Sequence, residues 1–191
     1  MTVTTVELIG NPRAGSRTRT LADAVVTELA SHLERAGNPL SRPTVLDLAE
    51  LVGVSFGPAA ARPDAPVDDP FAPVRAARLL VVATPAYKGT YTGLLKIFLD
   101  QLGPGDLAGV IALPVAVAGA PAHADRTATS LRDLLSELGA EATIPPLTAL
   151  ESRLAAPVEA AAEWVAAHAG QLGELLARTP ARGNLRLHHS R

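Results

Sequence analysis

The chain has 191 residues and no cysteine, so disulfides, thiolate metal sites, iron–sulfur clusters and cysteine nucleophiles are excluded. Its formal net charge of −2 gives no electrostatic reason to expect binding to nucleic acid or to a membrane surface. The longest uncharged apolar run, residues 108–122, is shorter than the ~20 residues that a membrane helix needs. Because the N-terminus also lacks the pattern of a signal peptide, we expect a cytoplasmic protein.

The first half of the chain predicts two strands and one long helix. An apolar, β-branched run at residues 3–9 predicts the first strand. Leucine and valine then recur every four positions, which predicts a helix over residues 18–36. Residues 44–48 predict a second short strand. The segment 52–73 is rich in glycine, proline, alanine and aspartate and predicts a long surface connection, with room for a short helix near residues 67–77.

The second half predicts three more strands and the helices between them. Near-continuous apolar runs at residues 78–83 and 110–117 indicate strands buried on both faces, as in a parallel sheet. Pro114 is awkward inside the second of these runs, because proline has no amide hydrogen to donate. Periodic leucines predict a helix after each run. Residues 142–147 can supply a fifth strand, and residues 160–177 predict an alanine-rich closing helix.

Five strands that alternate with helices, without an internal repeat, predict a doubly wound three-layer α/β sandwich. We interpret residues 1–177 as one domain and residues 178–191, which have little apolar content, as a tail. In such folds ligands bind beyond the carboxyl ends of the strands. Distinctive loops follow the first, third and fourth predicted strands, so we expect one composite site there.

The loop over residues 10–20 has the features of a phosphate site. It leads from a strand into a helix, whose N-terminal amide groups and dipole favour an anion. Arg13 can donate a forked pair of hydrogen bonds, and hydroxyl donors are available from Ser16, Thr18 and Thr20. The Walker and dinucleotide glycine patterns are absent, which excludes those two nucleotide sites. The hydroxyls alone fit a simple helix cap equally well, and Arg13 favours phosphate binding.

The other two loops suit a flat ligand. The loop over residues 84–93 holds both tyrosines of the chain, and Pro85 bends its backbone so that amide groups can face a ligand edge. Packing on the protein surface is the alternative role for both tyrosines; we favour ligand contact for Tyr87 and a subunit interface for Tyr91. The small residues of the loop 118–123 would let a flat ring approach the backbone closely.

All three loops resemble motifs of the NADPH-dependent FMN reductase family. Residues 10–21 resemble its phosphate loop, G-S-x-R-x-x-S-x-S/T-x-x-L, with Asn11 in place of the serine. Residues 83–100 resemble the more specific motif A-T-P-x-Y-K-x-x-Y-S-G-x-L-K-x-x-L-D, and residues 118–123 are similar to G-G-T-x-A-H. The second motif looks closest to the branch that supplies reduced FMN to two-component monooxygenases in sulfonate use. Quinone reductases of the superfamily usually read P-E-Y-N there.

The resemblance implies a flavodoxin-like fold, with a five-stranded parallel sheet in the order 2-1-3-4-5, and an NAD(P)H:FMN oxidoreductase. Its cofactors would be FMN and NADPH, with NADH as the alternative. It implies that the FMN phosphate contacts Asn11, Arg13, Ser16, Thr18 and Thr20. It implies that the flavin ring lies against Pro85, Ala86, Tyr87, Lys88, Gly119 and Ala120. Because the flavin carries the hydride chemistry, no catalytic side chain and no metal are expected.

Other functions stay open on the same fold. An FMN-containing quinone or azo reductase, or a flavodoxin-like electron carrier without nicotinamide activity, would bind the same cofactor. The expected partners are small flavin and nicotinamide molecules, a two-component monooxygenase, and further copies of the chain in a homodimer or homotetramer. Three arginines are candidates to bind the 2′-phosphate that distinguishes NADPH from NADH: Arg17, Arg19 and Arg126.

Overall fold

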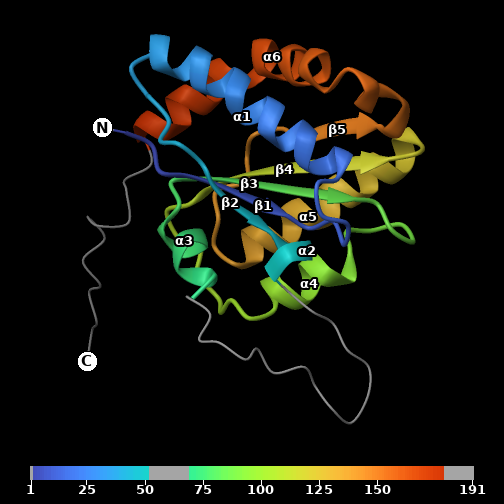
Figure 1. Cartoon of the computed structure of the whole chain (residues 1–191). Coiled ribbons are helices and arrows are strands. Elements are labelled where there is room, and N and C mark those ends of the chain that lie inside the picture. Colours follow the sequence, from blue (N-terminus) through green and yellow to red (C-terminus); the bar gives the residue numbers. More distant parts are fainter. Residues whose placement is uncertain (1, 52–68, 179–191) are drawn as a thin grey trace, which may run out of the picture.

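The computed structural model describes residues 2–51 and 69–178, and its centre is a parallel sheet (Figure 1). The strands are β1 (Thr5–Ile9), β2 (Thr44–Asp47), β3 (Leu79–Pro85), β4 (Ile111–Ala118) and β5 (Leu147–Leu150). All neighbouring pairs are parallel, in the order β2-β1-β3-β4-β5. The predicted flavodoxin-like sheet and its strand order are therefore confirmed.

Helices cover both faces of this sheet and make three layers (Figure 1). One face carries α1 (Arg17–Arg35) and α6 (Pro157–Arg178), and the other carries α3 (Phe71–Ala76), α4 (Gly93–Leu99) and α5 (Pro121–Glu137). Two short elements, α2 (Leu48–Leu51) and the 3₁₀ helix η1 (Glu151–Ala155), directly follow β2 and β5. Every residue of β3 and β4 is buried, as their near-continuous apolar sequences predict.

The fifth strand lies later in the sequence than predicted. The predicted strand covered residues 142–147, whereas β5 runs from Leu147 to Leu150. Pro145 and Pro146 stand immediately before it, and neither can donate an amide hydrogen bond to a neighbouring strand. The apolar signal at Ala142 and Ile144 reflects burial, since both side chains are buried outside the strand. The pairing therefore begins where the prolines end.

Pro114 fits inside β4 because of the direction in which its nitrogen points. The amide of Ala112 donates to the carbonyl of Glu141, on the β5 side of the strand. Successive amides of a strand alternate in direction, so the nitrogen of Pro114 faces that same side. The pairing of β4 with β5 runs from Val115 onward. Pro114 thus lies just before the ladder and removes no hydrogen bond from it.

The remaining predicted elements agree with the structure to within a few residues at their ends. Gly37 and Gly139 follow α1 and α5 with positive φ angles of 80° and 93°, as helix-ending glycines do. The short helix expected near residues 67–77 is α3. Most of the predicted long connection, residues 52–68, and nearly all of the predicted tail, residues 179–191, lie outside the described residues.

In the described part of the chain, no helix combines the length and apolar character needed to cross a bilayer.

Candidate functional site

A cavity of about 410 Å³ opens at the carboxyl ends of the central strands. The strand order reverses around β1 and β3, which is where doubly wound sheets leave a crevice for ligands. Cavities of similar volume lie between β5 and α6 and between α1 and β2, away from these loops. Lining residues of the 410 Å³ cavity are Asn11, Arg13, Ala14, Gly15, Ser16, Arg17, Thr18, Pro85, Tyr87, Val117, Glu151 and Leu154.

The loop after β1 is held in shape by its own polar side chains. The Oδ1 of Asn11 accepts the amide hydrogen of Arg13 at 3.0 Å, and its Nδ2 donates to the hydroxyl of Thr18 at 3.1 Å. Both Asn11 and Thr18 are buried polar residues. Ser16 is the N-cap of α1, and its Oγ accepts the amide hydrogen of Arg19 at 3.3 Å. Ser16 therefore caps α1 and also lines the cavity, so a helix-capping role and a phosphate-binding role are compatible.

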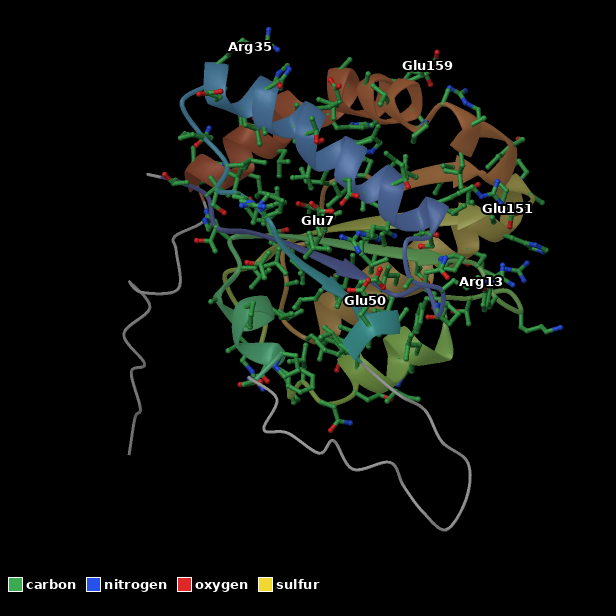
Figure 2. All side chains as sticks on the ribbon, viewed as in Figure 1. Glu7, Arg13, Arg35, Glu50, Glu151 and Glu159 are labelled. Atoms are coloured by element: carbon green, nitrogen blue, oxygen red, sulfur yellow. The ribbon has the colours of Figure 1, made fainter. Side chains whose placement is uncertain are left out.

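The arginines near this loop have different surroundings. Among the described residues, the guanidinium of Arg13 has no carboxylate or carbonyl partner, and Figure 2 shows Arg13 beside the N-terminal end of α1. Arg17 donates to the carbonyl oxygen of Glu151 at 3.5 Å and so links α1 to η1. Arg19 instead faces carboxylates, 3.4 Å from Asp47 and 3.9 Å from Asp23. Because its guanidinium faces these carboxylates, Arg19 is a weaker candidate than Arg126 for binding the 2′-phosphate of NADPH.

The loop after β3 forms a two-residue hairpin that carries Tyr87. The backbone of Tyr87 and Thr90 is joined by two hydrogen bonds, at 2.8 and 3.3 Å. Lys88 and Gly89 at its tip have φ angles of 54° and 89°, the left-handed conformation that such turns require. The Tyr87 side chain is 43% exposed and borders the cavity. The hairpin thus holds an aromatic ring at the mouth of the site.

Hydrogen bonds join the segment after β3 to the loop after β1 and to the end of β4. The hydroxyl of Thr92, which caps α4, donates to the carbonyl of Gly10. The amide of Ala86 donates to the carbonyl of Val117 at 2.7 Å. These bonds tie the loop after β1 to the start of α4, and the loop after β3 to the end of β4, so the walls of the cavity are held to one another.

The structure brings six of the predicted site residues into one cavity lining: Asn11, Arg13, Ser16, Thr18, Pro85 and Tyr87. Five others are not among the lining residues. Ala86 and Lys88 are chain neighbours of lining residues, and Gly119 and Ala120 follow β4 just beyond it. The exposed Thr20 is one turn into α1, where its hydroxyl donates to the carbonyl of Ser16 at 3.4 Å.

Six lining residues were absent from the predicted site: Ala14, Gly15, Arg17, Val117, Glu151 and Leu154. The first three belong to the phosphate-type loop and could have been included with it. Val117 precedes the predicted third loop by one residue. Glu151 and Leu154 come from η1, and no sequence signal pointed to them because the fifth strand was predicted too early in the chain.

The chemistry of the cavity fits FMN better than a metal. The buried Thr18 hydroxyl, the N-terminus of α1 and the guanidinium of Arg13 suit the phosphate. Pro85, Val117 and Leu154 give apolar surface for a ring. The volume lies within the ~300–1,000 Å³ of typical small-molecule sites. Among the described residues, no group of three or more histidine, aspartate or glutamate side chains could hold a metal ion.

Comparisons with known proteins agree with this chemistry. A family model described as NADPH-dependent FMN reductase matches residues 3–151. The NADH-dependent FMN reductase SfnE of Pseudomonas putida is 35% identical over 137 residues, which cover 71% of this chain and 70% of the relative. The apo structure of the NADH:FMN oxidoreductase EMOB is 26% identical, with a TM-score of 0.70 and 97% of both chains covered.

A more distant structure shows the fold alone. The WrbA-like flavodoxin of Agrobacterium tumefaciens has a TM-score of 0.63 at 16% identity, with 94% of this chain and 100% of that chain covered. The family model spans the loops after β1 and β3, the end of β4 and η1 up to Glu151, and so covers every lining residue except Leu154. The chain therefore belongs to the NADPH-dependent FMN reductase family and has its flavodoxin-like fold.

Proposed function

We propose that this protein is an NAD(P)H-dependent FMN reductase that transfers hydride from a nicotinamide to FMN. The carrying observation is the 410 Å³ cavity, in which a phosphate-type loop and an aromatic hairpin meet in a member of this family. The names of the similar proteins support the same activity, since SfnE is an NADH-dependent FMN reductase and EMOB an NADH:FMN oxidoreductase.

In this proposal the side chains and backbone of the protein bind FMN and orient it. When bound, FMN supplies the hydride-accepting chemistry, so the protein needs no acid–base pair. Ser16, Thr18 and Arg13 hold the phosphate together with the first amide groups of α1. The backbone and side chains of Pro85 and Tyr87 position the flat ring and exclude water from one side of it. Further proposed contacts are Asn11 and Thr20 for the phosphate, and Ala86, Lys88, Gly119 and Ala120 for the ring.

The reduced FMN is proposed to serve a partner monooxygenase. The motif over residues 83–100 resembles the sulfonate branch of the family, and the relative SfnE belongs to the FMN reductases by name. Such a role places the protein in the cytoplasm beside its partner. The same motif has Ala86 and Lys88 where quinone reductases usually carry glutamate and asparagine. This difference disfavours quinone reduction, which is the second candidate.

Steady-state kinetics test this assignment directly. Purified protein is mixed with NADPH or NADH and with FMN, riboflavin or menadione, and nicotinamide absorbance is followed. We expect FMN to be reduced, and faster than menadione. Turnover that is much faster with menadione would favour the quinone reductase. FMN binding without nicotinamide oxidation would favour an electron carrier and contradict the proposal.

A further inference from the structure

Three polar groups in the loop after β1 form a chain of hydrogen bonds with one fixed direction. The amide of Arg13 can only donate, so the oxygen of the Asn11 side chain must face it, at 3.0 Å. The Asn11 Nδ2 is then left facing the Thr18 hydroxyl, at 3.1 Å. An amide nitrogen can only donate, so the Thr18 oxygen must be the acceptor of this bond.

This direction determines what the Thr18 hydroxyl can still do. With its oxygen accepting from Asn11, the hydroxyl hydrogen must be donated elsewhere. Among the described residues, no acceptor takes a hydrogen bond from the Thr18 hydroxyl. The residue is 2% exposed and lines the 410 Å³ cavity. The Thr18 hydroxyl can therefore donate its hydrogen to an acceptor in the cavity, and an anion bound there would complete the chain of hydrogen bonds.

We infer that Asn11 is a positioning residue that fixes the Thr18 hydroxyl as a donor to the FMN phosphate, and so selects FMN over flavins without a phosphate. The inference rests on the proposed function and deepens it. It also explains the departure of this chain from the family motif, which has serine at the position of Asn11. A serine hydroxyl can donate or accept and would leave the direction undetermined.

The sharpest variant is Asn11→Asp, which replaces a donor nitrogen with an acceptor oxygen at nearly unchanged shape. The carboxylate can still accept from the amide of Arg13. The Thr18 hydroxyl would then donate to that carboxylate and present its lone pairs to the phosphate. Because the variant also adds a negative charge, it is combined with Thr18→Val in a double-mutant cycle that separates the two effects.

FMN and riboflavin affinities are measured by quenching of flavin fluorescence, for the wild type, both single variants and the double variant. For Thr18→Val we expect FMN to bind about tenfold more weakly, because one hydrogen bond to a charged group is lost. For Asn11→Asp we expect a loss of about a hundredfold in the wild-type background but only about tenfold in the Thr18→Val background. Riboflavin affinity is expected to change less than about twofold throughout, because riboflavin lacks the phosphate.

The outcomes separate failure of this inference from failure of the proposed function. A wild type that binds no FMN contradicts the proposed function. A wild type that binds FMN, with equal losses for Asn11→Asp in both backgrounds, overturns the positioning role and leaves only a charge effect. Equal losses of FMN and riboflavin affinity would overturn it as well, because they indicate a disrupted loop. Circular dichroism and thermal unfolding of each variant check that the loop change leaves the fold intact.

Discussion

Glu7 is a carboxyl group buried inside the protein, on β1 between the sheet and α1 (Figure 2). It is 1% exposed, and its Oε2 has no hydrogen-bond partner among the described residues. The pKa of Glu7 is raised from 4.5 to about 8, chiefly by burial and also by a hydrogen bond with Asp23 and by its charge, while the charge of Arg19 acts in the opposite direction. The folded protein therefore holds this proton at neutral pH, whereas the unfolded chain releases it.

This difference predicts a stability that falls as pH rises. Below the unfolded pKa both states are protonated, and between that value and about 8 the folded state binds more protons, so the free energy of unfolding decreases across this window. For Glu7→Gln we expect a flatter pH profile and a gain on the order of 4 kcal/mol above pH ~8. Urea unfolding of both proteins between pH ~5 and ~9 measures this pH dependence of the free energy of unfolding.

The matched control for this prediction is Glu159→Gln. It removes the same charge from an exposed position on α6, which Figure 2 shows on the outer side of that helix. We expect the Glu159 variant to keep the wild-type pH profile. A Glu7 variant with an unchanged profile would mean that Glu7 is ionised in the folded state at neutral pH.

At the scale of elements, the close contact between β1 and α4 depends on Gly10. A Cβ placed on Gly10 would lie 2.7 Å from the Cβ of Leu95, a distance that real Cβ atoms do not tolerate. For Gly10→Ala we expect a loss of about 1–3 kcal/mol in the free energy of unfolding and weaker FMN binding, because α4 and the loop after β1 must separate.

Gly170→Ala serves as its control, with an effect of opposite sign. Gly170 lies within α6, and a Cβ there would meet nothing within 4 Å. Alanine is the better helix former, so this variant is expected to gain about 0.5–1 kcal/mol. Denaturant unfolding of both variants gives the comparison, and a Gly10 variant as stable as the wild type would show that α4 is free to move.

The hairpin of Tyr87–Thr90 and α5 together place two cations next to the site. The Nη1 of Arg126 would lie 3.8 Å from a Cβ on Gly89, so the guanidinium lies against the hairpin tip, beside Lys88. The Thr90 and Ser130 hydroxyls are 3.5 Å apart and join the same two elements. In the part of the chain that the structure describes, neither Lys88 nor Arg126 forms an ion pair.

We propose that these two cations bind the 2′-phosphate of NADPH. For Arg126→Gln we expect the KM for NADPH to rise about fivefold or more and that for NADH to change little, because one charged hydrogen bond to phosphate is lost. Arg132→Gln is the control on the same helix, since Arg132 is 3.9 Å from Asp133 and away from the hairpin. Equal changes of both KM values would exclude Arg126 as the discriminating residue.

At the scale of the whole molecule, apolar side chains on α4 suit contact between copies of the chain. Ile97 on this helix is 45% exposed, and Leu94 and Tyr91 beside it are only half-buried. We expect a homodimer or homotetramer in gel filtration and a shift toward smaller species for Ile97→Asp, because a charge in an apolar interface is costly. Val158→Asp, at a 57% exposed position on α6, is expected to leave the assembly unchanged. A wild type that elutes as a monomer would contradict this prediction.

The sequence by itself determined the fold class and the family. Short apolar runs bounded by turn residues favour buried parallel strands, which β3 and β4 are. The glycines and hydroxyls of the first loop act locally, so Gly10, Arg13 and Ser16 were recognisable from their neighbours alone. The motif over residues 83–100 identified the expected ligand as a flavin. The predicted position of β5 was wrong because Ala142 and Ile144 are buried outside any strand, and their apolar side chains give the same sequence signal as a strand.

The tertiary structure decided what depends on contacts between distant residues. The approach of Glu151 to Arg17 spans more than half of the chain and completes the cavity from η1. The same packing placed Arg19 beside the carboxylate of Asp47 and buried the carboxyl of Glu7. Local patterns carry no information on such partners, because which side chains meet is set by how strands and helices stack.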